Sequence, residues 1–301
     1  MPMLVVNSDP ERLWGKNPEP TPEELKEMYF TIRPLGRGNI TITIPKEIDA
    51  SYGTSLSYSV NGEDWIDTVI DNTAQTISIP VNKNDIYLKG ISNKAWGRTY
   101  FNRTGINTAQ STNISSDVDI EVLGNPLSLF YGDNFTNNTV LPGLENNDDY
   151  SSALGGLFAN NTHLINAEHL LIEEIGSASA SFFGMFYNCS NLVKAPKNII
   201  WTTTYSSKYY RCKYMFYGCS SLITAPIINL VNLKLGDCQE MFSGCSNLKY
   251  IKMLATDVSG SGCLINWVKD VAATGTFVKT TGVSIPTGVN GIPSGWTVEE
   301  V

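Results

Sequence analysis

The sequence predicts a β-rich α+β protein, with an N-terminal antiparallel β-sandwich domain followed by a short α/β solenoid. Two observations support this fold class: short alternating polar and apolar segments in the first half, and a block that recurs four times in the second half. Frequent prolines near the start indicate an arm ahead of both domains. Regular short strands are typical of a sandwich, and recurring blocks are typical of stacked coils. The expected domains are an N-terminal arm at 1–27, the β-sandwich at 28–124 and the solenoid with terminal caps at 125–301.

The composition excludes several classes of protein. The chain has 301 residues, of which 17% are charged and 42% hydrophobic, and its formal net charge is -8. A disordered chain needs low hydrophobicity and a high fraction of charges, so we expect a folded protein. Binding to phosphate backbones requires a basic stripe, which the sequence lacks, so nucleic acid is not expected as a partner. The apolar runs are far shorter than the ~20 residues that span a bilayer, so membrane insertion is not expected.

The first 27 residues are expected to form an extended arm, because proline restricts the backbone there. Thr21 and Glu24 form a capping-box pattern around Pro22, so a short helix is predicted at 22–28. Leu13 and Trp14 are the bulky residues with which the arm would pack on its own domain or dock on a partner subunit. The first six residues lack the features of a signal peptide, so we expect the chain to stay where it is made; the alternative is a leader that was removed.

The β-sandwich is predicted from alternating patterns and turn residues. In residues 39–45, polar residues alternate with isoleucine, which is the pattern of a half-buried strand. The pair Asn61-Gly62 predicts a hairpin turn, with Trp65 in the core of the hairpin. Strands are expected at Tyr29–Arg33, Asn39–Pro45, Ser55–Val60, Trp65–Val69, Gln75–Val81, Asp85–Ile91 and Asp117–Leu123.

Four aligned segments in the second half share an anchor phenylalanine, and these anchors are Phe158, Phe186, Phe216 and Phe242. Counted from the phenylalanine, apolar residues recur at -4, -1, 0 and +3, which predicts a helix of about two turns with one buried face. Asn or Gly at +2 is expected to end that helix, because both tolerate a left-handed backbone. A short strand should follow and pair in parallel with the next coil. It starts at the leucine in position +6, which is Leu164, Leu192, Leu222 or Leu248.

The block Met-Phe-x-Gly/Asn-Cys-Ser-x-Leu is intact in three copies and degenerate in the first. It resembles the BspA-like leucine-rich repeats of gut Bacteroidetes, such as Bacteroides, and of their phages. The segments at 128–134 and 263–298 look like the usual entry and exit of such arrays. The resemblance implies a leucine-rich-repeat solenoid that serves as a non-enzymatic display or adhesion surface, and it supplies no catalytic residues.

Both ends of the array depart from the repeat pattern. In the first copy Asn161 stands where the other copies have cysteine, which predicts a capping coil exposed on one side. After the last copy, residues 264–272 are predicted to form an amphipathic helix that caps the array. Its inward residues would be Leu264, Trp267, Val268 and Val271.

The cysteines follow the columns of the repeat. Cys189, Cys219 and Cys245 share one column, whereas Cys212 and Cys238 share a column that holds Phe or Leu in other copies. A cysteine that alternates with Phe and Leu acts as a small buried apolar residue, so free buried thiols are expected. No CxxC spacing indicates zinc, and no cofactor or metal is expected.

No catalytic residues are expected. His163 and His169 lie beside the first copy, away from the buried cysteines, so a turn or surface role is expected for both. The adjacent acids at 148–149 and 173–174 would point apart on a strand and be solvated. The loop at 145–149 offers oxygen donors for calcium but lacks the spacing of an EF-hand.

The leading functional expectation is a non-enzymatic structural or binding protein, a phage virion component such as a head or tail fibre or a decoration protein. Its repeat surface would adhere to a host-surface protein or glycan, and its arm would attach to other virion or cell-surface proteins. Tyr205, Tyr209 and Tyr210 are candidate sugar or protein contacts, or else they pack beneath the loop between coils. One alternative is a secreted, extracellular BspA-like adhesin of the bacterial cell surface without its leader. A second is a carbohydrate-active enzyme or its accessory module. A homo-oligomer is compatible with either class.

Overall fold

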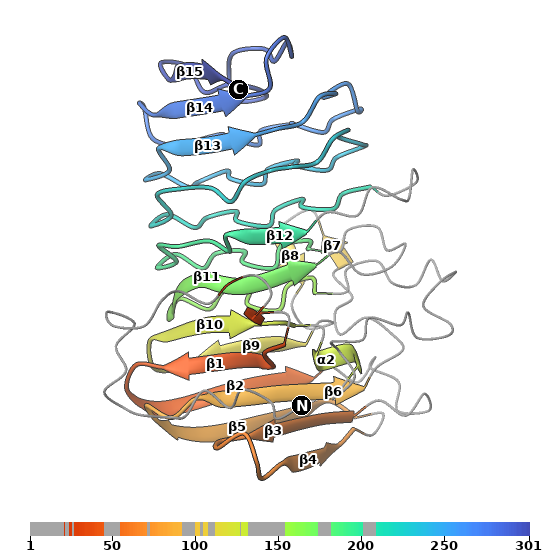
Figure 1. Cartoon of the computed structure of the whole chain (residues 1–301), viewed down its shortest axis with the longest axis vertical. Coiled ribbons are helices and arrows are strands. Elements are labelled where there is room, and N and C mark those ends of the chain that lie inside the picture. The colour runs from red at the N-terminus through yellow and green to blue at the C-terminus, as the bar shows by residue number, and fades with distance from the viewer. Residues whose placement is uncertain are drawn as a thin grey trace.

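The computed structural model is an elongated stack, with the N-terminal strands at one end and the C-terminus at the other (Figure 1). Strands predominate over helix, so the β-rich character expected from the sequence is confirmed. The structure describes residues 21, 24–25, 27–44, 55–70, 73–91, 100–102, 105–107, 112–126, 128–131, 154–173, 182–200 and 209–301.

Eight of the N-terminal strands form two antiparallel sheets. In the larger sheet the strands lie in the order β4-β3-β6-β1-β10, and the smaller sheet has the order β5-β2-β9. Buried side chains from both sheets belong to one hydrophobic core. The bounds are β1 (Phe30–Pro34), β2 (Arg37–Ile44), β3 (Ser55–Ser59), β4 (Ile66–Val69), β5 (Gln75–Asn82), β6 (Ile86–Ile91), β9 (Asn113–Ser116) and β10 (Ile120–Gly124).

Strands occupy all seven segments in which the sequence predicts them, and the hairpin of β3 and β4 is confirmed. Gly62 in its turn has a φ of 79°, which glycine adopts without steric cost. Trp65 is only half-buried, and its ring packs edge-on against Tyr29 with 5.0 Å between the centroids. It therefore lies at the margin of the hairpin core. Three short strands were not expected: β9, β7 (Tyr100–Asn102) and β8 (Gly105–Asn107).

The capping box ahead of β1 is present. The Glu24 N–H donates to Thr21 Oγ1 at 3.2 Å, and the Thr21 N–H donates to the Glu24 carboxylate at 2.8 Å. Leu25 completes the helical turn and is fully buried, so this turn is held on the core. Leu13 and Trp14 lie outside the described residues.

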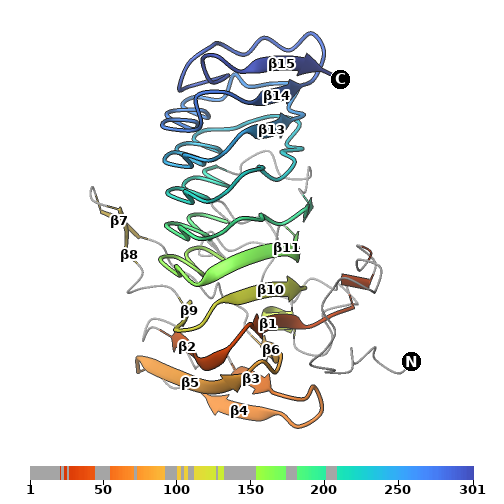
Figure 2. The same ribbon diagram turned by 90° about the vertical axis from the view of Figure 1, so that its left-hand side faces the viewer.

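Beyond β10 the strands run in parallel, and each lies in the next layer of the stack (Figure 2). β11 (Leu164–Glu173) pairs with β10, so the large sheet continues across the junction expected near residue 124. β12 (Asn198–Ile200) pairs with β11. β13 (Tyr250–Met253), β14 (Thr276–Lys279) and β15 (Thr297–Glu300) follow in the same parallel sense.

Single parallel bridges join the layers between β11 and β13. Lys194 bridges to Asn166 on one side and to Thr224 on the other, and Thr224 bridges to Tyr250. Strand-like pairing therefore passes from layer to layer even where the strands are too short to be continuous.

The helices predicted in the four copies are wrong, because consecutive turns stand in their place. Residues with positive φ recur at intervals of four: Gly184 and Asn188 flank Phe186, and Glu240 and Gly244 flank Phe242. A right-handed helix does not accommodate such residues. Within the described residues the helical segments are α2 (Ser128–Tyr131) and residues 24–25.

Backbone hydrogen bonds explain why turns replace the helix. The Met185 N–H donates to the Phe182 carbonyl within its own turn, whereas the Phe186 N–H donates to the Met215 carbonyl in the next layer. Alternate N–H groups therefore point along the stack, where they bond the neighbouring copy. A turn every four residues buries one side of the chain much as a helix does, which is why the apolar pattern was compatible with both.

The capping helix predicted at 264–272 is also wrong. This segment forms turns with positive φ at Asn266 and Asp270. Three of its expected inward residues are buried nonetheless: Leu264, Trp267 and Val268. Val271 is half-buried. The Trp267 indole N–H donates to the Gly291 carbonyl at 2.7 Å, which ties the segment to the last layer.

A column of aromatic rings runs through the repeat copies and into the layers on either side of them. Phe158, Phe186, Phe216 and Phe242 are each 0% exposed, and their rings stack nearly parallel at centroid distances of 5.5, 5.1 and 5.6 Å. Phe30 of β1 continues the column at one end and Trp267 at the other, at 5.9 and 6.0 Å. The leucines at +6 are also fully buried, and these are Leu164, Leu192, Leu222 and Leu248.

The expectation that the first copy is exposed on one side is wrong. Asn161 is 2% exposed, and its side-chain amide donates to the Ile114 carbonyl of β9 at 3.1 Å. The Ile114 N–H in turn donates to the Leu157 carbonyl at 2.7 Å. The N-terminal sheets therefore act as the preceding layer and cover the first copy.

Candidate functional site

Two of the three tyrosines singled out from the sequence, Tyr209 and Tyr210, belong to the described residues. Tyr209 is 41% exposed, whereas Tyr210 is half-buried and Tyr205 lies outside the described residues. The ring of Tyr210 lies against Gly236 in the next layer, where an added Cβ would come within 2.2 Å of it. Tyr210 is thus packed closely against a glycine, and Tyr209 is the more accessible of the two.

A different set of tyrosines clusters on the turn side of the stack, and we name Tyr187, Tyr214 and Tyr217 the tyrosine cluster. The rings of Tyr187 and Tyr217 stack with 4.9 Å between centroids and 9° between planes. Tyr214 meets both edge-on, at 6.3 and 5.7 Å. All three are partly exposed, so the cluster forms an aromatic surface.

The repeat places these rings together. Tyr187 and Tyr217 each follow an anchor phenylalanine directly, so they occupy the same column in adjacent layers. Their layers are joined by backbone bonds, including one of 2.7 Å from the Asn188 N–H to the Tyr217 carbonyl. Tyr214 stands in a column that holds Gly184 in the preceding copy, and the absence of a side chain there leaves room for its ring beside Phe183, at 5.7 Å.

Polar and charged groups border the tyrosine cluster. The Tyr214 hydroxyl donates to Glu240 Oε1 at 3.2 Å, and the Lys213 ammonium lies 5.2 Å from the centre of the Tyr214 ring. Burial, together with the Glu240 carboxylate, raises the pKa of Tyr214. Burial also lowers the pKa of Lys213, against the influence of Glu240. On the edge of the first layer, the Asn188 amide donates to Asn160 Oδ1 at 3.2 Å.

Within the described part of the chain, the hydroxyls of Tyr187 and Tyr217 make no hydrogen bond. A phenolic hydroxyl both donates and accepts, so each is available to a ligand. Burial raises the pKa of Tyr187, with Tyr217 and Glu240 adding to the effect, so this hydroxyl stays protonated near neutral pH.

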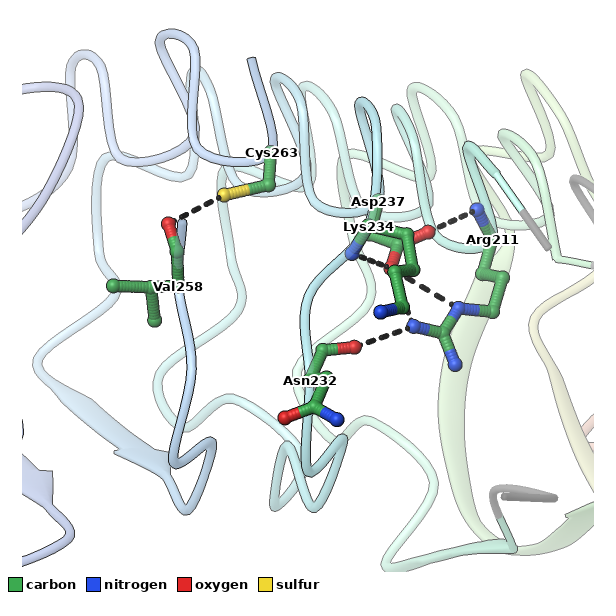
Figure 3. Close-up of polar contacts among 6 residues, drawn as sticks. All are labelled: Arg211, Asn232, Lys234, Asp237, Val258 and Cys263. Atoms are coloured by element: carbon green, nitrogen blue, oxygen red, sulfur yellow. Dashed lines mark hydrogen bonds and ion pairs between the residues drawn. The ribbon is translucent and has the colours of Figure 1, made fainter. Parts of the chain in front are cut away.

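A buried ion pair fixes the two layers next to the cluster (Figure 3). Arg211 is 6% exposed and Asp237 is 0% exposed. The Arg211 Nε donates to the Asp237 carboxylate at 3.1 Å, and its Nη2 also donates to the Asn232 carbonyl at 3.0 Å. The same carboxylate accepts the Lys234 N–H at 2.6 Å. The other carboxylate oxygen, Oδ1, accepts the Arg211 backbone N–H at 3.3 Å, so both oxygens hold the backbone in place.

The cysteines lie inside the stack. All six are free and buried. In each intact copy, the thiol of the cysteine that lies three residues after the anchor phenylalanine donates to a backbone carbonyl. The acceptor is the carbonyl of the anchor phenylalanine in the preceding layer, for example from Cys219 to the Phe186 carbonyl at 3.0 Å. Cys263 extends the column of Cys212 and Cys238 into the layer after the last copy, since the Cys238 N–H donates to the Cys263 carbonyl. Its thiol donates to the Val258 carbonyl at 3.2 Å (Figure 3).

The other candidates from the sequence include a histidine that the structure describes and acids that it does not. His163 lies 3.1 Å from Asp119 at the surface, and the acids at 145–149 and Glu174 lie outside the described residues. Among the described residues, no group of three or more His, Cys, Asp or Glu side chains is arranged to hold a metal ion. In the same part of the chain, no helix is long and apolar enough to cross a bilayer.

The sequence did indicate part of the tyrosine cluster. Tyr187 and Tyr217 stand at the same place after Met-Phe, and a column comparison identifies them as neighbours in adjacent layers. What the sequence did not indicate is their exposure, because a helix was expected there. The column of Tyr214 was missed because its other members are glycine or glutamate.

No protein-family model matches the chain, and neither a curated protein nor a solved structure matches it significantly.

Proposed function

We propose that the chain is a non-enzymatic binding and display protein built on a leucine-rich-repeat solenoid of the BspA-like type. The observation that carries this proposal is the stacked pair Tyr187 and Tyr217, two partly exposed rings on layers that backbone hydrogen bonds hold together. Rigid, partly exposed tyrosines are typical of binding surfaces, because little side-chain entropy is lost on contact.

The stiffness of the scaffold supports a role in display. Pairing continues from β4 at one end to β15 at the other through strands and single bridges, and the aromatic column runs from Phe30 to Trp267 within this stack. The distances between side chains on neighbouring layers of this stack are fixed, so several weak contacts with a large partner can form at the same time. Such an element suits adhesion to a surface better than capture of one small molecule.

The location that we propose is the virion of a bacteriophage, as a head or tail fibre or a decoration protein that touches the host surface. The N-terminal arm at 1–27 would attach the chain to another virion protein, because an extended segment binds without needing a core of its own. This part of the proposal rests on the resemblance of the repeat block and on the composition of the arm.

Immunogold microscopy of phage particles and of the bacteria that carry the gene tests the location. Labelled particles support a virion component, whereas label on bacterial cells without particles supports the alternative of a secreted cell-surface adhesin. Removal of residues 1–27 tests the arm: particles that still incorporate the shortened chain would overturn its role in attachment.

A release assay tests the third possibility, a carbohydrate-active enzyme. Purified protein is incubated with host-surface polysaccharide, and reducing ends are measured over time. Steady release that scales with protein concentration would overturn the non-enzymatic proposal, and binding without release would support it.

A further inference from the structure

We propose that the tyrosine cluster is a binding site for a neutral pyranose ring of a glycan, an inference that rests on the proposed binding role of the stack. Tyr187 and Tyr217 would contact the sugar directly, and Tyr214 would position them. The ligand class follows from three properties of the site: the faces of its rings, its free hydroxyls and its balance of charge.

The rings of Tyr187 and Tyr217 stack on each other, and each has an outer face that points away from its partner. No large side chain from the same column of the repeat covers these outer faces. The residues in the same column of the flanking layers are Ala159 and Ser243, both of which are small and buried. No large side chain of this column therefore extends over the outer face of Tyr187 or Tyr217. An aromatic face carries negative charge density and attracts polarised C–H groups, which a pyranose presents on one side of its ring.

The hydroxyls supply the polar part of the contact. Those of Tyr187 and Tyr217 have no hydrogen-bond partner within the described part of the chain, while that of Tyr214 is engaged by Glu240. Sugar hydroxyls, like phenols, donate and accept, so the pairing is satisfied in either direction. An apolar peptide side chain would leave both phenols unpaired on contact, which costs binding free energy.

The charges near the cluster favour a neutral ligand. One carboxylate, from Glu240, and one ammonium, from Lys213, border Tyr214. The chain as a whole has a net charge of -8, so an anionic sugar would approach a protein of the same sign. A neutral sugar meets no such repulsion, and its hydroxyls can use both charged groups as hydrogen-bond partners.

Tyr214 is a positioning residue. Its ring touches both members of the stacked pair, and its hydroxyl is tied to Glu240 in the next layer. This bond fixes the plane of Tyr214 and thereby limits the tilt of Tyr187 and Tyr217. Replacing Glu240 with glutamine keeps a hydrogen-bond acceptor at the same place, and E240Q is expected to retain the bound geometry more fully than E240A.

Saturation-transfer difference NMR on the full chain tests the proposal, with methyl glucopyranoside, methyl galactopyranoside, methyl mannopyranoside and N-acetylglucosamine as neutral probes and glucuronate as the anionic one. We expect transfer from the protein to the ring protons of at least one neutral probe and none to glucuronate. Absence of transfer to every neutral probe at millimolar concentration, or stronger transfer to glucuronate, would overturn the inference.

Variants assign the binding to the tyrosine cluster. The double variant Y187A/Y217A is expected to weaken affinity by at least about tenfold, since each ring contributes stacking. Y187F/Y217F keeps the rings and is expected to lose about threefold to tenfold through its missing hydroxyls. Y250A removes a 36% exposed tyrosine from the strand side and is the matched control, with unchanged affinity.

Circular dichroism and thermal melts establish that each variant is folded before its affinity is compared. If Y187A/Y217A does not fold, Y187F/Y217F still decides the question, because it removes only two exposed oxygens. A glycan affinity that survives in Y187F/Y217F and Y187A/Y217A alike would place the sugar elsewhere and overturn this site.

The outcome is distinguishable from failure of the proposed function. If the full chain adheres to host cells and Y187A/Y217A adheres equally, the glycan site is wrong while the binding role stands. If sugar binding depends on the cluster but neither particles nor cells display the chain, the site stands and the proposed location is wrong.

Discussion

The side-chain amide of Asn161 donates to the main-chain carbonyl of Ile114 at 3.1 Å, which joins the first repeat copy to the N-terminal sheet. In the later copies the same column holds cysteine, whose thiol donates to the carbonyl of the preceding anchor phenylalanine. Asn161 therefore makes the corresponding bond of the column, with a carbonyl of β9 as the acceptor. The backbone of His163 also uses this side chain, since its N–H donates to Asn161 Oδ1 at 3.0 Å.

Replacing Asn161 with alanine should destabilise the protein by about 1–3 kcal/mol, because it leaves a buried carbonyl and an N–H without a partner. Equilibrium unfolding in urea, followed by circular dichroism, measures the loss. N191A is the matched control, since Asn191 is exposed in a turn of the second copy, and it should change the free energy of unfolding by less than about 0.5 kcal/mol. Equal effects of the two variants would show that the Asn161 bonds do not support the junction.

Phe216 lies at the centre of the aromatic column, between rings at 5.1 and 5.6 Å. Phe216→Ala should cost about 3–5 kcal/mol, because it removes a fully buried ring and leaves a cavity between two layers. Phe216→Leu retains most of the volume and should cost less. Thermal and denaturant unfolding of both variants tests the order; a loss below about 1 kcal/mol for the alanine variant would contradict close packing of the column.

Asp237 is the buried partner of Arg211 and also accepts the Lys234 N–H. Asp237→Asn should destabilise the chain by about 3–5 kcal/mol, because a buried guanidinium loses its counter-charge. The control is Lys194→Ala, which breaks a half-exposed pair with Glu168 and should cost about 0–1 kcal/mol. A smaller effect in the Asp237 variant than in the Lys194 variant, measured by urea unfolding, would be contrary to a structural role for the pair.

The buried cysteines should be inert in the native protein. Burial raises the pKa values of the thiols of Cys189, Cys219 and Cys245, and raises that of Cys263 to about 11. Since the thiolate is the reactive form, Ellman's reagent should find almost no reactive thiol at pH 8 and all six in guanidinium chloride. Rapid reaction of one thiol without denaturant would identify a cysteine more open than its burial indicates.

The same pKa shifts predict loss of stability at alkaline pH. Because the folded-state pKa of each column thiol is raised, the folded state holds its proton more tightly than the unfolded state. This stabilisation is complete below the ordinary thiol pKa of 9.0 and declines as the pH rises above it. Urea midpoints should therefore fall between pH 8 and about pH 10.5. In a C189A/C219A/C245A variant the fall should be smaller, and an identical fall in both proteins would assign it to other groups.

Much of the fold could be predicted from the sequence. Alternating patterns, turn residues and regular spacing together predicted seven strands, because each side of a strand meets either the core or solvent. The repeating phenylalanines predicted neighbours in space, and their rings stack in the order of the copies. The capping box of Thr21 and Glu24 was also correct, since it depends on residues only three apart.

The candidate site could be predicted from the sequence only in part. Tyr187 and Tyr217 could be placed in one column, but the sequence pointed to Tyr205, Tyr209 and Tyr210 as the contacts. Exposure of a ring depends on what the adjacent layers place beside it: Gly236 lies beneath Tyr210, whereas Ala159 and Ser243 flank the stacked pair. These neighbours are more than 20 residues away along the chain.

The sequence by itself determined seven N-terminal strands, the spacing of the copies and the burial of the repeated phenylalanines and leucines, because the order of polar and apolar residues follows the periodic burial of side chains. The tertiary structure decided the conformation between the strands, where residues such as Gly184 and Asn188 adopt positive φ and alternate N–H groups bond the next layer. It also decided that the first copy is covered, since the Asn161 amide finds its acceptor in β9. Both outcomes depend on hydrogen bonds between segments that are distant in the sequence. A backbone N–H that donates to a carbonyl of another layer cannot also form the hydrogen bond of a helix, although the local apolar pattern is compatible with one.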